Sequence, residues 1–245
     1  MKLVAFLTMI FFGLTVKAQE LQLHYDFRHS LDPANNRSNY PTLFFQYFKT
    51  LDSGSLFIKP GSFMMKMQTD FKGKDNNQGN FYMQVSQSFR CWKPKIFIHL
   101  EYSGGLGIAE PGSYGYYITN SFSAGLSHLC SWKGGYYNFA LDYRYNAFER
   151  PSHDAMISFY WWKGLLNYKI EISGDVELWT VNKNRGDAGS SSLKGKLVLM
   201  FGEPQVWYNL NQHFALGTRI NIYFHIYDIA NQIQVYPSPG LKYKF

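Results

Sequence analysis

Apolar and polar residues alternate along most of this chain with a period of two. The last residues show the pattern clearly, because Leu241, Tyr243 and Phe245 are separated by single lysines. In a β-strand this period sends every second side chain to the same face, so one face is apolar and the other polar. Such a strand would be exposed at the edge of an open sheet. We therefore expect it to pair with another strand, and the candidate is the segment 20–28.

The segment 20–28 alternates without an exception, since its odd positions are all apolar up to Phe27. The same pattern recurs along the chain and predicts twelve strands, at 20–28, 41–48, 63–71, 81–89, 96–103, 118–126, 137–146, 157–161, 169–178, 197–201, 214–226 and 239–245. Pro204, near the end of the tenth strand, predicts a bulge or a break, because proline cannot donate a hydrogen bond to the sheet.

The composition favours a membrane barrel over a soluble fold. Aromatic residues make up 19% of the chain and charged residues only 17%. A soluble core would use more aliphatic residues, and a helical membrane protein would contain long apolar runs. Alternating lipid-facing and water-facing strands account for both values, with aromatics at the two interfaces. We predict an all-β protein, a twelve-stranded antiparallel transmembrane β-barrel of the outer membrane. A large secreted β-sandwich is the alternative, because it also alternates.

The first residues have the form of a secretory signal peptide. Lys2 precedes an apolar run from Leu3 to Val16, and a small residue, Ala18, follows. The run has about 14 residues, fewer than the roughly 20 that a membrane-spanning helix needs. We expect a signal peptide at 1–18, cleaved after Ala18, and a barrel at 19–245. The expected location is the cell outer membrane of a Gram-negative type of cell, where the aromatic C-terminus resembles the signal read by the barrel-assembly machinery.

The predicted connections alternate in length. Those after strands four, six, eight and ten are short, whereas those after the odd strands tend to be longer and polar. Barrels of this class have short periplasmic turns and longer outer loops, so both chain ends are expected at the periplasmic rim. Glycine-rich or polar loops are predicted at Gly104–Tyr114 and Asn182–Ser192. The connection 49–61 is long where a short one is expected, and its role is not explained by the pattern.

Cysteine content and charge restrict the possible partners. Cys91 and Cys130 are the only cysteines, and both are predicted in short turns at the same rim. A disulfide would need their Cα atoms within about 7 Å, so the sequence leaves a bridge open. No metal-ligand spacing surrounds them, and no cofactor is expected. Basic and acidic residues are interleaved along the chain rather than clustered, so we expect no nucleic-acid partner. The expected partners are outer-membrane lipid, the barrel-assembly machinery and a small polar solute.

The polar faces of the strands supply the candidate functional residues. Twelve strands lie between the eight that side chains can fill and the sixteen that leave an open channel, so the lumen should be narrow. Mixed charges beside aromatic rings suit a small polar solute that carries an aromatic base. The alternative is a salt-bridged filling that only satisfies the interior. The candidates are His24, Asp26, Arg28, Lys66, His99, Glu101, Asp142, Arg144, Asp175, Glu177, Arg219, Asn221 and His225, with Asp70 and Glu171 also on this face.

Several stretches resemble a family of outer-membrane barrels related to the Tsx-like nucleoside-specific channels. They are 21–27 (LQLHYDF), 101–105 (EYSGG), 203–209 (EPQVWYN) and 240–245 (GLKYKF). The resemblance covers nearly the whole chain after residue 18, and the segment around 50–60 is an addition to the family pattern. It implies a twelve-stranded barrel and, more loosely, the passage of nucleosides. The resemblance assigns no nucleoside-contacting role to an individual residue of this sequence.

The main hypothesis is therefore a channel for small polar solutes such as nucleosides. A structural or surface-interaction barrel that transports nothing is the alternative. A barrel enzyme acting on lipid is less favoured, because it would need a Ser and His pair with an orienting third residue at the bilayer. Ser127 and His128 are adjacent but have no evident third member, and no GxSxG motif is present. We expect no enzymatic activity.

Overall fold

The computed structural model describes residues 19–245 except 51–57, 93, 110–111, 113, 148–149, 187 and 228–230, so the expected signal peptide lies outside the described residues. The strands are β1 (Gln19–Asp26), β2 (Tyr40–Thr50), β3 (Lys59–Asp70), β4 (Asn80–Arg90), β5 (Ile96–Ala109), β6 (Tyr114–Trp132), β7 (Gly135–Asn146), β8 (Ser152–Leu165), β9 (Ile170–Asn182), β10 (Lys196–Gly202), β11 (Gln205–Asn209), β12 (Phe214–Phe224) and β13 (Ile233–Lys244). Two short helical segments are α2 (Arg28–Leu31) and η1 (Lys74–Asn76). Among the described residues, no helix has the length and apolar character needed to cross a bilayer.

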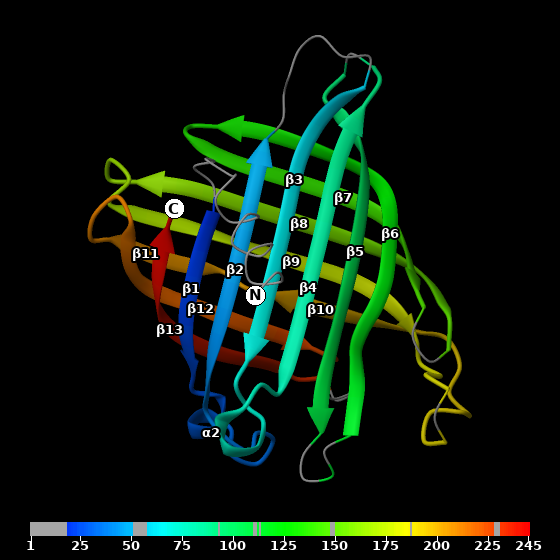
Figure 1. The fold of residues 1–245 in the computed structure, drawn as a ribbon. Helices are drawn as coiled ribbons and strands as arrows, with labels where there is room; N and C mark the ends of the chain where they lie inside the picture. Colours follow the sequence, from blue (N-terminus) through cyan, green and yellow to red (C-terminus); the bar gives the residue numbers. More distant parts are fainter. Residues whose placement is uncertain are drawn as a thin grey trace, which may run out of the picture.

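The strands form one antiparallel sheet that closes on itself. β1 pairs with β13, with Leu23 opposite Leu241, as the alternation at the two ends predicts. β10 and β11 both lie between β9 and β12, with which each of them pairs, so together they occupy one strand position. The closed barrel therefore has twelve strand positions. The interruption between them contains Pro204, which confirms the predicted break. Figure 1 shows β1 to β5 along the near wall with β8, β9, β11 and β12 crossing behind them.

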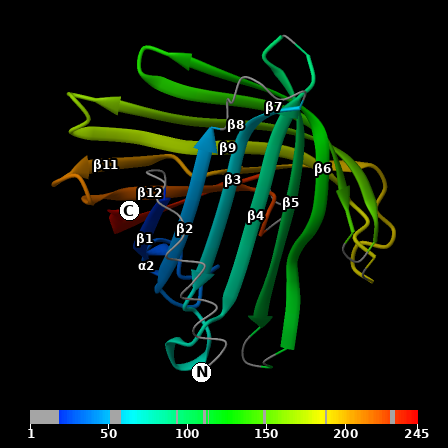
Figure 2. The ribbon, with the colours of Figure 1, turned by 45° about the horizontal axis from the view of Figure 1, so that its top comes forward.

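Burial alternates along the strands and is inverted relative to a soluble protein. Trp207, Arg219 and Lys242 are at most 1% exposed, whereas Leu141 is 62% exposed and Leu241 is 40% exposed. Polar side chains therefore line the lumen and apolar side chains face outward, which is the arrangement of a barrel in lipid. In Figure 2 the near and far walls curve around this lumen, and β6 bends along the edge where they meet.

The two rims of the barrel differ in their connections. We call the rim that carries residues 19 and 244 the terminal rim, and the opposite one the distal rim. The terminal rim has the connections 51–58, 91–95, 133–134, 166–169 and 210–213. The distal rim has 27–39, 71–79, 110–113, 147–151, 183–195 and 225–232. Most short turns thus lie at the rim of the chain ends, as predicted, and 51–57 falls outside the described residues.

The glycine-rich loop predicted at Gly104–Tyr114 is wrong. β5 continues to Ala109, and β6 begins at Tyr114, directly opposite Ala109 in the hairpin. The glycines make room for tyrosines within strands. A Cβ atom at Gly104 would lie 2.4 Å from the Tyr102 hydroxyl, and one at Gly107 would lie 2.3 Å from the Tyr116 ring. Here glycine indicates close side-chain packing on a strand, and not a turn.

Three predicted boundaries also differ from the structure. The first strand ends at Asp26, and Arg28 begins α2. The turn predicted at Lys163–Gly164 is wrong, because β8 runs to Leu165 and the chain reverses at 166–168, where three residues have φ between 49° and 63°. His225 follows β12 with a φ of 58° instead of extending that strand.

The cysteines are both free. Cys91 lies in the turn after β4, as predicted, but Cys130 lies within β6, opposite Tyr137, and not in a turn. The hairpin of β6 and β7 turns only at Lys133 and Gly134, both of which have positive φ. The two-residue turn therefore leaves Cys130 in the sheet.

Candidate functional site

All the sequence-predicted site residues are buried on the lumen side of the barrel. None of the thirteen is more than 8% exposed, from His24, His99, Asp175 and Arg219 at 1% to His225 at 8%. Asp70 and Glu171 are buried as well. Most lie on strands, whereas Arg28 lies in α2 and His225 in the loop after β12. The structure does not gather them into one site but divides them among several polar clusters along the lumen.

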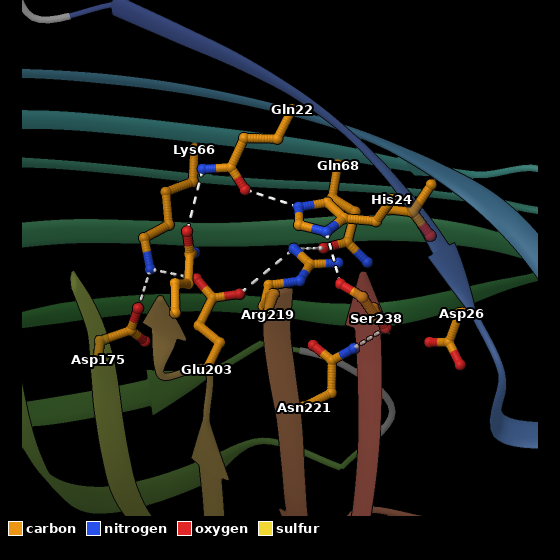
Figure 3. Close-up of polar contacts among 12 residues, drawn as sticks. Gln22, His24, Asp26, Lys66, Gln68, Asp175, Glu203, Arg219, Asn221 and Ser238 are labelled. Atoms are coloured by element: carbon orange, nitrogen blue, oxygen red, sulfur yellow. Dashed lines mark hydrogen bonds and ion pairs between the residues drawn. The ribbon is translucent and has the colours of Figure 1, made fainter. Parts of the chain in front are cut away.

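The first cluster ties opposite walls of the barrel and is centred on Lys66 of β3. The Lys66 ammonium donates to the carboxylates of Asp175 on β9 and of Glu203, which it contacts at 2.7 Å. Arg219 of β12 lies 3.5 Å from the other Glu203 oxygen and donates to Gln68 at 2.9 Å. Figure 3 shows Lys66 reaching from one wall to these acids on the other. We call Lys66, Asp175, Glu203 and Arg219 the central cluster; its two cations and two anions cancel.

A separate chain of hydrogen bonds lies beside the central cluster and connects β1 with β11 and β13. The His24 ring contacts the Ser238 carbonyl at 3.0 Å through Nδ1 and the Gln22 amide oxygen at 2.7 Å through Nε2. Gln22 donates to Gln205 at 3.1 Å, and Trp207 donates to the same Gln205 oxygen at 2.9 Å. Asn221 lies nearby and donates to the Ser238 hydroxyl (Figure 3). These contacts hold the polar groups of the seam strands in fixed orientations.

Four acids, Glu101, Asp142, Asp175 and Glu177, face the lumen from β5, β7 and β9 beside His99 and Arg144, and the Arg144 guanidinium lies 4.9 Å from the centre of the Trp179 ring. Glu177 accepts from the Tyr160 hydroxyl at 2.6 Å and from the Gln84 amide at 2.8 Å. His99 contacts Asp142 at 2.9 Å. Within the described part of the chain, Glu101 has no ion pair and accepts from the Ser103 hydroxyl. This wall offers hydrogen-bond acceptors to the lumen.

A second charged cluster lies near the terminal rim. Glu171 accepts from Lys242 at 2.6 Å and from Lys244 at 2.8 Å, and Lys242 also pairs with Glu20 at 2.9 Å. The Lys242 ammonium lies 4.6 Å from the centre of the Trp207 ring. A cation over an indole face is attracted by the ring quadrupole. The contacts connect β9, β11 and β13 across the seam region.

Arg28 lies among four tyrosine rings at the distal end of the barrel. Its guanidinium donates to Asp26 at 2.8 Å and lies 5.1 to 5.7 Å from the centres of four tyrosine rings, those of Tyr40, Tyr223, Tyr227 and Tyr236. The Tyr223 and Tyr227 hydroxyls are each 3.4 Å from it. We call Arg28 and these four tyrosines the mouth cage. The rings come from β2, β12, β13 and the loop after β12, so one arginine holds together the rim of the opening.

The loop 27–39 is tied to the mouth cage through Tyr236. The Tyr236 hydroxyl donates to Asp32 at 2.8 Å and accepts from Asn36 at 3.3 Å. Hydrogen bonds from Tyr236 and Asn35 lower the pKa of the Asp32 carboxyl. A lowered pKa in the folded state means that this contact stabilises the loop at neutral pH and that its contribution is lost as pH falls through that pKa.

Several site residues escaped the sequence reasoning. Glu203 lies in the interruption between β10 and β11, where the period of two fails, so alternation assigned it no face. The lumen is also lined by Gln84, Tyr160, Gln205 and Trp207. The period of two along β4 is the signal that could have placed Gln84 on the lumen side. The alternation places Lys242 on the polar face of the last strand, outside the predicted candidates, and the structure buries it fully.

Two further features of the site were tested by the geometry. Ser127 and His128 point to opposite faces: Ser127 is 3% exposed and lies 3.1 Å from the Ser88 hydroxyl, whereas His128 faces outward and contacts the Lys95 carbonyl. They cannot act as a nucleophile and base pair. In the residues that the structure covers, no group of three or more His, Cys, Asp or Glu side chains could hold a metal ion.

Comparisons with known proteins agree with this architecture. A family model described as "Domain of unknown function (DUF5020)" matches residues 18–245. The structure is similar to that of the NanC porin, with a TM-score of 0.51 and 9% identity over 93% of this chain and 100% of that one. A more distant likeness is LpxR from Salmonella typhimurium, with a TM-score of 0.43 and 11% identity over 92% of this chain and 100% of that one. Another is Omp33 of Acinetobacter baumannii, with a TM-score of 0.38 and 10% identity over 94% of this chain and 98% of that one. No curated protein matches the sequence significantly.

Proposed function

The chain belongs to the family described as Domain of unknown function (DUF5020), and from this starting point we propose that it is an outer-membrane channel for small polar solutes. The proposal includes cleavage of the signal peptide at 1–18, insertion by the barrel-assembly machinery and a location in the outer membrane. The outward apolar face and the closed barrel support the location.

The charged interior is the observation that carries the proposal. A barrel that only had to be stable could fill its centre with apolar side chains, since replacing buried ion pairs by well-packed hydrophobic residues is often neutral or stabilising. Here the lumen instead holds Lys66, Arg219, Asp175 and Glu203 at no more than 4% exposure. Retaining these groups is reasonable where water and a polar solute must pass them.

The finer part of the proposal concerns nucleosides. A nucleoside offers hydroxyls for carboxylates and amides and an aromatic base for stacking. The lumen supplies acceptors at Glu101 and Glu177, a buried ring at Trp207 and a half-buried ring at Tyr160. The resemblance to the Tsx-like channels supports the same solute class. We propose no catalytic role.

A structural barrel that transports nothing is the second candidate. The observation that favours it is the contact of Lys66 with acids on the opposite wall, which places side chains across the lumen. The mouth cage adds a second closure at the distal rim. A channel of this design must therefore conduct weakly or open its clusters during passage.

Planar-bilayer recording of the purified protein separates the two candidates. We expect discrete conductance steps that nucleosides reduce at millimolar concentration, because a bound solute blocks ions in a narrow lumen. The double variant Lys66→Gln, Asp175→Asn, which leaves the Arg219–Glu203 pair in place, should keep the steps but alter their size and ion selectivity. Lys183→Gln, at an exposed loop position, is the control and should alter neither.

Two results would count against the proposal in different ways. Absence of any conductance in a correctly folded barrel would favour the structural candidate. Conductance that is indifferent to nucleosides and to sugars would leave a channel but remove the nucleoside assignment.

A further inference from the structure

Two lysines converge on one outward tryptophan at the terminal rim. Trp132 ends β6 on the outer face and is 60% exposed. The Lys133 ammonium lies 4.9 Å from the centre of its ring and the Lys163 ammonium lies 5.9 Å from it. We call these three residues the lysine–tryptophan patch. It is separate from the lumen and takes no part in the proposed channel.

The backbone places the patch. Trp132 pairs with Gly135 across the β6–β7 hairpin, and Gly135 pairs with Lys163 of β8, so the patch lies along one row of three strands. Lys133 occupies the two-residue turn with a φ of 46°, and Gly134 follows with a φ of 76°. Such turns match the twist of the flanking strands and hold their residues at defined positions. The convergence of the lysines therefore follows from strand register.

The patch has no counter-charge in the chain around it. The segments 127–137 and 159–170 contain no Asp or Glu. The ion pairs found in the described part of the chain include neither Lys133 nor Lys163. Glu171, the next acid in sequence, is buried in the lumen and engaged by Lys242 and Lys244. Two lysine ammonium groups that have no ion-pair partner and lie beside one ring favour the binding of an anion from outside the chain.

Aromatic side chains continue from the patch along the outer face. Trp132 lies 6.5 Å from Tyr137, which stacks on Phe159 at 6.4 Å, and Phe159 stacks on Trp161 at 5.3 Å. Tryptophan and tyrosine collect at the boundary between hydrocarbon and headgroups. Lysine places its stem along apolar surface and its ammonium in the polar layer. The lysine–tryptophan patch is thus at the depth where lipid phosphates lie.

We propose that the lysine–tryptophan patch binds the phosphate of an anionic phospholipid headgroup. Two ammonium groups within 6 Å of one ring centre place two positive charges beside the same headgroup, and a headgroup without a cation of its own adds no repulsion. A choline headgroup would bring a third positive charge to the same ring. Phospholipid is the source because short-turn rims of this class face the periplasm, whose side of the outer membrane is phospholipid.

Native mass spectrometry of the full-length protein in mild detergent tests the proposal. The probe is an equimolar mixture of phosphatidylglycerol and phosphatidylcholine with the same acyl chains. We expect the protein to retain phosphatidylglycerol preferentially. Lys133→Gln with Lys163→Gln should lower that retention roughly tenfold or more, because each surface lysine strengthens binding to anionic lipid. Lys133→Arg with Lys163→Arg should keep it.

The control is Lys183→Gln with Lys194→Gln, which removes the same charge from exposed positions at the distal rim and should leave retention unchanged. Heat-modifiable migration on a gel checks that every variant is folded. The proposal is overturned if the patch variant retains as much phosphatidylglycerol as the wild type, if both lipids bind equally, or if the distal variant loses retention to the same extent. A second mixture, of lipid A and phosphatidylglycerol, tests the source of the phosphate, and preferential retention of lipid A would overturn the assignment to phospholipid.

Discussion

Arg28 shows how one residue can control an opening formed by several strands. Its burial is compensated by the Asp26 carboxylate and by the faces of the mouth-cage tyrosines. Cation–π contacts strengthen when the cation is removed from water. Because Arg28 is 7% exposed, these contacts are worth more here than at an open surface. The mouth should therefore stay closed while Arg28 is in place.

Removing Arg28 together with Asp26 tests this closure. We expect Arg28→Ala with Asp26→Ala to raise single-channel conductance, because the rings lose the cation that gathers them and no buried charge is left unpaired. Planar-bilayer recording measures the change. Lys183→Ala, at an exposed position, is the control. Conductance equal to that of the wild type would place the narrowest point of the lumen elsewhere, at the central cluster.

The seam between β1 and β13 is the element that makes the sheet a barrel. The outward residues of the two strands face each other in register, as Leu21 with Tyr243 and Leu23 with Leu241. Phe245 extends the seam, since its backbone N–H donates to the Gln19 carbonyl at 3.1 Å. Without this pairing both strands would present unsatisfied backbone groups to lipid, which costs several kcal/mol for each group.

Gly240 is the position at which the seam is most sensitive to a side chain. A Cβ atom there would lie 2.5 Å from the Leu23 carbonyl and 2.7 Å from the His24 ring. We expect Gly240→Val to prevent closure and to reduce the heat-modifiable fraction in membranes strongly. Gly115→Val is the matched control, because the nearest atom to a Cβ there is 4.0 Å away. Equal folded fractions for the two variants would show that the seam tolerates a side chain at Gly240.

On the scale of the whole molecule, the central cluster joins strands that are distant in sequence. Lys66 is 109 residues from Asp175 and 137 residues from Glu203. Each of these groups would be costly to bury alone, so the cluster is stable only when the barrel has closed and brought them together. The interior therefore selects one arrangement of the walls.

Lys66→Met measures this dependence. The substitution leaves Asp175 and Glu203 without their shared cation, and we expect the free energy of unfolding to fall by about 3–5 kcal/mol. Urea unfolding in liposomes, followed by tryptophan fluorescence, measures the loss. Adding Asp175→Asn, which leaves Glu203 paired with Arg219, should recover most of it, and Lys183→Met at an exposed loop position should cost under about 1 kcal/mol. A loss no larger than that of the control would mean that water already screens the cluster.

Prediction from the sequence succeeded where side chains repeat with the period of the sheet and failed where they do not. The sequence predicts correctly that Leu23 faces outward and that His24 and Asp26 face the lumen. A shift of the strand register by one residue would turn every side chain of the strand to the opposite face, so only one register puts the apolar residues outside. The glycines at 104 and 107 were misread as a loop, because only the packed structure shows the tyrosines that need the space. Glu203 was missed because it follows the last regular residue of β10.

The inversion of the barrel, with apolar residues outside and polar residues inside, can be predicted from the sequence, because each segment carries the period of two on its own. The pairing at the seam can be predicted as well, because two alternating end segments would otherwise be exposed edges and the connection lengths place both at one rim. The partners of the buried cations, such as Glu203 for Lys66 and the four tyrosines for Arg28, are known only from the folded barrel. Those contacts depend on the curvature of the closed sheet and on the register of every strand pair around the barrel. A pattern within one segment contains no information about the other segments' registers.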